Sequence, residues 1–300
     1  MTLTPDVLYE RRNFKKQLYI WKALALLFVF VTLFVISSKN HESSGGDFIA
    51  RIDIEDIILE NNKRAEKLKK IAENKNVKAV IFRINSPGGT SYGGEQLYNA
   101  IRLISQHKPT ISIIGTVAAS GGYMVAIASD YIIAGKTSLT GSIGVIMQGF
   151  DARDLLIKKI GVTPYSFKSS ELKASPSPFE EVTPKVKEAI ELSIKDTFTV
   201  FKTMVKERRD LSNEELDVVS DGRIFTGVQA KDLKLIDNLG DEEEALSWLR
   251  EKKNVPEKLK IKDFKIDDKN RYLEEIINTK SIHNFLLNFI TNNQFLTIWK

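Results

Sequence analysis

The chain has 300 residues, of which 42% are hydrophobic, enough to form one large or two modest folded domains. It contains no cysteine, which excludes disulfide bonds, cysteine-ligated metals and thiol catalysis. The 44 basic and 39 acidic residues are well mixed and give a net charge of only +5, and several of the basic residues fall in the first 22 positions. This distribution argues against nucleic acid as a partner and is typical of a membrane topology signal.

An apolar segment directly follows the basic N-terminal residues. Residues 18–37 predict a transmembrane anchor, because a helix of this length spans roughly 30 Å of hydrocarbon, with Trp21 at the interface. A cleaved secretory signal is the alternative, because the uncharged stretch 23–36 is short and Ser37 lies at a possible cleavage site. In both cases residues 1–17 stay in the cytoplasm, and the chain after Ser37 crosses the membrane.

The rest of the chain divides by composition into a linker, a folded domain and a tail. Residues 38–47 are polar and predict a linker, and from 48 to 254 strand and helix patterns alternate. This alternation predicts an α/β fold with a largely parallel sheet. Strands are expected at 48–54, 79–84, 110–114, 131–134, 143–147 and 163–167, and helices at 58–73, 94–106, 152–160, 183–209 and 241–252. Residues 255–300 predict a helical tail that packs on the body, on another subunit or on the membrane.

One serine lies at a predicted turn from strand to helix. Ser120 follows the strand 110–114 and several small residues, and it precedes Gly121, Gly122 and helix-compatible residues. The N-terminus of a helix offers unpaired amides and a partial positive charge, and glycine lets a substrate carbonyl approach the backbone closely. Ser120 is therefore a candidate nucleophile, with an ordinary helix N-cap as the alternative.

A second glycine turn follows the predicted strand 79–84. It reads Ser86-Pro87-Gly88-Gly89, and we expect it beside Ser120 because the carboxyl ends of parallel strands meet at one sheet edge. The amide of Gly121 and that of Gly88 or Gly89 could then form an oxyanion hole.

A serine nucleophile needs a base, and the chain offers few candidates. The three histidines, His41, His107 and His283, lie outside glycine-rich or strand-end contexts, so we expect them at the surface and expect no Ser-His-Asp triad. The other possible base is a lysine kept neutral by burial. Lys168 and Lys173 lie outside the charged runs that hold most other lysines, although a plain solvated lysine is the alternative for each.

Five motifs, in order, resemble the signature blocks of the signal peptide peptidase A family. They lie at 86–89, 118–123, 139–145, 168–173 and 221–230, within a matching region from about 48 to 249. The resemblance implies a membrane-anchored Ser/Lys-dyad serine endopeptidase. It also implies a fold similar to the Clp protease and crotonase group, a parallel-sheet spiral of ββα units, over residues 48–254.

The resemblance also implies roles for single residues. Ser120 resembles the nucleophile, Lys173 the general base and Ser142 the hydroxyl that orients this lysine. Gly121, with Gly88 or Gly89, resembles the oxyanion hole. This chemistry needs no metal and no cofactor, and the sequence has no ligand-spaced cluster or phosphate-binding loop that would suggest one.

The chain departs from the family pattern in the loop after Lys173. Family members usually carry a basic residue after a Ser-Pro step, whereas here Ser177-Pro178-Phe179 is followed by Glu180 and Glu181, which affects the expected contacts of the loop. Family members of this length assemble as homo-oligomeric rings. Lys173 is therefore expected to serve Ser120 of its own or of a neighbouring subunit.

The resemblance implies peptide substrates, namely cleaved signal peptides degraded in or at the membrane. The catalytic domain is then expected on the extracytoplasmic, periplasmic side of the inner or plasma membrane. A related membrane protease that acts on other membrane or misfolded segments is the alternative, as is a non-catalytic membrane scaffold. A crotonase-like acyl-CoA enzyme is disfavoured, because it has no use for the motif that contains Lys173.

Overall fold

The computed structural model describes residues 21–22, 24–32 and 46–266. The chain divides into two units, Met1–Asp47 and Phe48–Lys300. In the first unit, residues 24–32 are helical, and their apolar side chains are exposed. Among the described residues, no helix is both long and apolar enough to cross a membrane. Segment 1–17, residues 18–20, 23 and 33–37 of the predicted anchor and residues 38–45 of the predicted linker lie outside the described residues.

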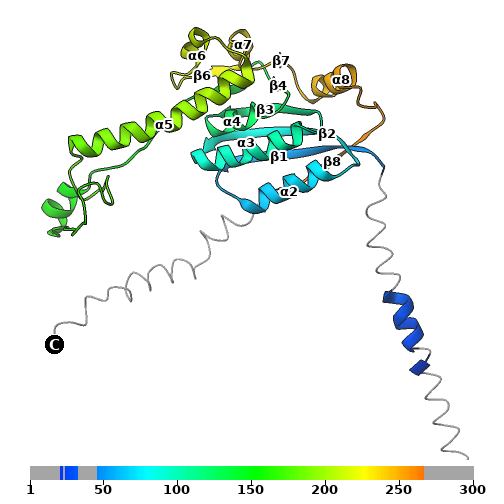
Figure 1. The fold of residues 1–300 in the computed structure, drawn as a ribbon, viewed down its shortest axis with the longest axis horizontal. Coiled ribbons are helices and arrows are strands. Elements are labelled where there is room, and N and C mark those ends of the chain that lie inside the picture. Colours follow the sequence, from blue (N-terminus) through cyan, green and yellow to red (C-terminus); the bar gives the residue numbers. More distant parts are fainter. Residues whose placement is uncertain (1–20, 23, 33–45, 267–300) are drawn as a thin grey trace, which may run out of the picture. The chain divides into compact units, whose positions relative to one another are not determined.

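The second unit is built around a mixed sheet whose strands are mainly parallel (Figure 1). Its main path has the order β6-β5-β3-β2-β1-β8, while β4 pairs with β3, and β7 pairs with β4. All pairs are parallel except β5 with β6. The strands are β1 (Phe48–Ile58), β2 (Val77–Gly89), β3 (Thr110–Ala119), β4 (Tyr131–Ala134), β5 (Leu139–Gly141), β6 (Ile224–Thr226), β7 (Asn238–Leu239) and β8 (Lys260–Phe264). The predicted α/β class with a parallel-dominated sheet is confirmed.

Helices cover both faces of this sheet, because alternate side chains of each strand point to opposite faces. In β1, Ile52 joins the larger core with α2, α3 and α4, whereas Ile49 joins a smaller core with α8. The helices are α2 (Asn62–Glu73), α3 (Ser91–Ser105), α4 (Gly121–Ala126), α5 (Pro184–Arg209), α6 (Asn213–Val219), α7 (Gly227–Asp232) and α8 (Glu242–Lys253), and Leu155–Ile160 form a π-helix.

The strand β3 divides its pairing between two partners. Residues 111–114 pair with β4, and residues 117–119 pair with β5. The last pair joins Ala119 to Gly141, so the residues that follow them emerge at the same edge of the sheet. This edge carries Ser120.

Three predicted elements are wrong. Residues 143–147 and 163–167 form no strand, since no neighbouring strand is there to accept their hydrogen bonds. The helical tail expected from residue 255 is wrong for β8, which pairs in parallel with β1. Arg51 of β1 binds Asp263 of β8 at 2.6 Å, and Phe48 stacks on Phe264. Such long-range contacts stabilise β8 as a strand although its own sequence is highly charged. Residues 267–300 of the predicted tail lie outside the described residues.

Candidate active site

Ser120 occupies a sharp turn between β3 and α4. Its backbone has φ 52° and ψ −120°, a conformation that side-chain-bearing residues rarely adopt and that active-site turns hold at a cost. The Ser120 amide donates to the Gly141 carbonyl (2.8 Å), and the Ser120 carbonyl accepts from the Met124 amide (2.9 Å). The side chain makes no capping bond, and no described residue hydrogen-bonds its Oγ. The N-cap alternative for this hydroxyl therefore fails.

The glycine turn at the end of β2 lies directly against the Ser120 turn. Gly88 has φ 110°, and a Cβ at this position would lie 2.9 Å from both the Ala119 carbonyl oxygen and the Gly121 amide nitrogen. A Cβ on Gly121 would lie 3.3 Å from the Gly89 amide nitrogen. Only glycine permits this approach of the two backbones. The structure thus brings together Ser120, Gly121, Gly88 and Gly89.

The two glycine amides at the end of β2 differ in their hydrogen bonding. The Gly88 amide donates to Ser86 Oγ (3.1 Å) and is therefore already engaged. The amide of Thr90, the residue after Gly89, donates to the Ile58 carbonyl of β1 (3.0 Å). The Gly89 amide lies between these two engaged groups, beside Gly121.

Ser142 emerges beside Ser120 at the sheet edge. Ser120 follows Ala119 and Ser142 follows Gly141, and these two preceding residues pair with each other at the ends of β3 and β5. Ser142 has φ 50°, and its amide donates to the Arg223 carbonyl (2.8 Å), which fixes the turn after β5. The structure therefore places both predicted hydroxyls on neighbouring turns.

A small hollow opens at Ser120. It measures about 30 Å³, room for about one water molecule, and α5 closes one side with Thr197 and Phe201. Other lining residues include Gly89, Gly121 and Met124. None of the lining residues is acidic, basic or histidine, so the hollow contains no candidate base from its own chain.

Lys173 lies far from Ser120 within one chain. Its side chain is exposed, in the segment 147–183 before α5, which we call the arm. Two residues earlier, Glu171 binds Thr183 (3.0 Å) and Lys185 (3.3 Å) at the start of α5, whereas Thr197 of the same helix reaches the hollow. At about 1.5 Å per residue, α5 rises roughly 20 Å between Thr183 and Thr197. In Figure 1 the arm and the first half of α5 extend away from the sheet.

The two candidate lysines have different surroundings. Lys168 Nζ forms an ion pair with Glu180 and donates to Ser175 Oγ (3.2 Å). Glu180 also accepts from Ser166, and these hydrogen bonds, that from Lys168 first, lower the pKa of its carboxyl. No described residue pairs with the Lys173 ammonium. A lysine that acts as a base has to lose its proton, which a paired carboxylate opposes.

Comparison with known proteins identifies the family. The profile of Peptidase family S49 matches residues 102–256, and that of Clp protease matches residues 53–148. This chain belongs to peptidase family S49. The family resemblance stated from the five motifs is thereby confirmed, and the S49 chain is a peptide hydrolase by family.

Several named proteases are similar to this S49 chain. It is 36% identical to a "Putative protease" of Synechocystis, over 67% of this chain and 72% of that protein. It is 32% identical to "Protease 4" of Haemophilus influenzae, over 76% of this chain and 35% of that protein. It is 31% identical to "Serine protease SPPA, chloroplastic" of Arabidopsis thaliana, over 71% of this chain and 31% of that protein.

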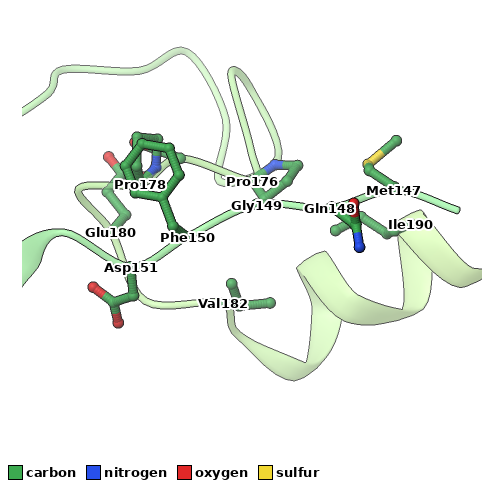
Figure 2. A pocket seen from close by; sticks show the side chains of 11 residues that line it. Met147, Gln148, Gly149, Phe150, Asp151, Pro176, Pro178, Glu180, Val182 and Ile190 are labelled. Atoms are coloured by element: carbon green, nitrogen blue, oxygen red, sulfur yellow. The ribbon is translucent and has the colours of Figure 1, made fainter.

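The arm of the S49 chain and Ile190 of α5 line an open pocket of about 470 Å³ that shares no lining residue with the Ser120 hollow. Figure 2 shows its lining, which includes Met147, Phe150 and Pro178 of the arm and Ile190 of α5. The arm also exposes large apolar side chains, among them Phe167 at 94%. Large contiguous apolar patches on a protein surface are common at interaction sites.

The remaining candidates lie outside the site of this S49 domain. His107 is exposed just after α3, as expected, and His41 and His283 lie outside the described residues. No group of metal-ligating side chains occurs in the described part of the chain. Sequence reasoning missed Thr197 and Phe201, because nothing local indicates which turn of a long helix packs on a distant strand end.

Proposed function

We propose that this S49 chain is a membrane-anchored serine endopeptidase whose nucleophile is Ser120 and whose general base is Lys173 of a neighbouring subunit. The observation that carries the proposal is the Ser120 turn, where an unengaged hydroxyl lies beside the amides of Gly121 and Gly89. The distance along α5 supports a base supplied by another subunit, and the unpaired ammonium of Lys173 supports its choice over Lys168.

In the proposed mechanism, neutral Lys173 Nζ takes the proton of Ser120 Oγ, which attacks the carbonyl carbon of the scissile peptide. The amides of Gly121 and Gly89 donate to the resulting oxyanion. The Lys173 ammonium then protonates the leaving amine, and an acyl ester remains on Ser120. Lys173 next takes a proton from water, whose oxygen attacks the ester. As the acid leaves, the Lys173 ammonium returns this proton to Ser120 Oγ, and the serine and the neutral lysine are regenerated. Ser142 is proposed to orient Lys173 by a hydrogen bond.

Gly89 is favoured over Gly88 as the second oxyanion donor. An amide that already donates to Ser86 Oγ is poorly placed to donate to a substrate as well, and this is the state of Gly88. Gly89 is the neighbour of Gly121 and carries no such bond to a side chain. The sequence alone left the two glycines equivalent.

The proposed substrates are cleaved signal peptides, degraded at the extracytoplasmic face of the inner or plasma membrane. The apolar segment 18–37, proposed as the anchor, supports this, because it would hold the domain next to such substrates. The apolar arm supports a ring of identical subunits that brings each arm to a neighbour's Ser120. A spiral of ββα units is the proposed topology of the domain.

The test is cleavage of a synthetic signal peptide by the full-length chain in detergent, comparing wild type with Ser120→Ala and Lys173→Ala. Lys187→Ala is the matched control, because Lys187 is also exposed and, among the described residues, its ion-pair partner is Glu191 on the same helix. We expect wild type and control to cleave, and both site variants to be inactive while still assembled. A wild type that cleaves no peptide would support the scaffold alternative instead.

A further inference from the structure

Ser86 has a buried hydroxyl that the proposed chemistry does not use. Its side chain is completely excluded from solvent. Its Oγ donates to the Asp56 carbonyl on β1 (2.5 Å) and accepts from the Gly88 amide (3.1 Å). The Gly88 carbonyl is more distant, at 3.4 Å, so the single proton of the hydroxyl belongs to the bond with Asp56. One hydroxyl therefore ties β1 to the turn that carries Gly88 and Gly89.

The backbone on both sides of Ser86 is irregular. The pairing of β1 with β2 passes from Glu55 with Asn85 to Ile57 with Gly88, so the register shifts here. Asp56, which lies in this shift, has φ 61°. Such backbone persists only where its surroundings hold it. The two hydrogen bonds of Ser86 stabilise this backbone conformation where the regular strand pairing is interrupted.

The Ser86 backbone also contacts the nucleophile turn. A Cβ built on Gly122 would lie 2.6 Å from the Ser86 carbonyl oxygen. Ser86 pairs with Ala118, close to the end of the strand that leads to Ser120. Ser86 therefore contacts both turns whose amides face the hollow.

We propose that Ser86 is a positioning residue for the oxyanion hole. By engaging the Gly88 amide, it fixes the peptide between Pro87 and Gly88, and so sets the point from which the next peptide holds the Gly89 amide beside that of Gly121. The inference rests on the proposed function, because it concerns the same site. Ser86 is buried beneath the turn and acts through the peptide between Gly88 and Gly89, without contact to substrate.

The test compares kcat and KM for signal-peptide cleavage by full-length wild type, Ser86→Ala, Ser86→Cys and Ser112→Ala. Ser112 is the matched control, because it is equally buried and its Oγ lies 2.8 Å from Ser129 Oγ, away from both turns. Ser86→Ala should lower kcat roughly 10- to 100-fold with KM within about twofold, because oxyanion contacts strengthen in the transition state. Ser86→Cys, of similar size but a weaker donor and acceptor, should have an intermediate kcat.

Binding of a peptidyl boronate gives an independent readout, because its tetrahedral adduct on Ser120 places an oxygen at the two amides. We expect Ser86→Ala to weaken this binding at least about tenfold and Ser112→Ala to leave it unchanged, although both lower the Tm.

The inference is overturned if Ser86→Ala has the kcat of wild type, or if Ser112→Ala lowers kcat by the same factor as Ser86→Ala. If Ser86→Ala does not assemble, Ser86→Cys is measured in its place. A lowered kcat then supports the inference, and an unchanged kcat overturns it. An active wild type with an inactive Ser120→Ala and an unaffected Ser86→Ala refutes only the role of Ser86. An inactive wild type refutes the proposed function, and this role with it.

Discussion

Lys168 and Glu180 form an ion pair within the arm. This pair distinguishes Lys168 from Lys173, the other lysine of the Lys-Ser-Ser-Glu-Leu-Lys motif. Glu180 stands near the position where related sequences were expected to carry a basic residue, and the structure gives it a partner. The Lys168 ammonium is thus engaged by a carboxylate of its own arm. Lys173 has no such partner in the described part of the chain, which leaves it available for a site on another subunit.

Lys173→Ala should therefore abolish cleavage, and Lys168→Ala should only reduce it. We expect a loss of at least about 1,000-fold for Lys173→Ala, as for removal of an essential base, and less than about tenfold for Lys168→Ala, which removes one partly exposed ion pair. Peptide cleavage at equal concentrations of assembled protein measures both. Equal losses would mean that the base has been assigned to the wrong lysine.

A dyad shared between subunits predicts complementation. Ser120→Ala and Lys173→Ala chains are each inactive, but in a mixed ring some sites combine the intact serine of one chain with the intact lysine of its neighbour. With random mixing, on the order of one quarter of the sites are complete. Refolding the two variants together should restore activity to about this fraction.

The control for complementation is the double variant Ser120→Ala/Lys173→Ala mixed with Lys173→Ala, which provides no intact lysine. Size-exclusion chromatography and differently tagged chains verify that mixed rings have formed. Mixed rings without any activity would contradict a base supplied by the neighbour.

The two turns at the sheet edge, which carry Ser120 and Gly89, could be predicted from the sequence, whereas the direction of α5 and the strand β8 could not. Ser120 and the glycines of the second turn could be placed together, because the carboxyl ends of parallel strands share one edge. The separation of Lys173 from this edge follows from the direction of α5, which rises roughly 20 Å between Thr183 and Thr197 and which no local pattern encodes. Similarly, β8 is selected by contacts with β1, such as Arg51 with Asp263, and its charged sequence predicts no buried strand.

The failed strand at 143–147 has a related cause. Ile143 is buried, but Ile146 is 78% exposed and Met147 54%, so the apolar alternation does not correspond to a core face. Met147 is the first residue of the arm, and Ile146 directly precedes it. In the proposed ring these side chains would be covered by a neighbouring subunit, and an apolar pattern for such an interface resembles that of a buried strand.

Gly88→Ala should damage both stability and activity. Gly88 has φ 110°, and an added Cβ would lie only 2.9 Å from two backbone atoms, so the substitution forces the two turns apart. We expect a loss of roughly 1–3 kcal/mol in the free energy of unfolding and a severe loss of kcat. Urea unfolding and peptide cleavage measure the two effects.

The matched control is Gly149→Ala, because a Cβ there meets nothing within 4 Å and its φ lies outside the left-handed region. It should change the free energy of unfolding by less than about 1 kcal/mol. If Gly88→Ala behaved like this control, the close contact between the two turns would be wrong.

The arm should loosen in acid before the sheet does, because three of its carboxyls have lowered pKa values. Hydrogen bonds from Arg153 lower the pKa of Asp151 to about 2. Bonds from Thr183 and Lys185 lower the pKa of Glu171, and those from Lys168 and Ser166 lower that of Glu180. A lowered pKa contributes stability above the ordinary value, 3.8 for Asp and 4.5 for Glu, and this contribution is lost as the pH falls through the folded value.

Hydrogen exchange, corrected for its intrinsic pH dependence, should therefore show weaker protection of residues 147–183 as the pH falls below about 4, while β1–β3 stay protected. Glu180→Gln removes one of the three contributions, so its arm should be less protected at pH 7 and change less on acidification. Glu243→Gln, in the first turn of α8, is the control and should leave the arm unchanged. Protection of the arm that stayed constant down to pH 2, or that fell equally in Glu180→Gln and wild type, would show that these carboxylates do not hold the arm.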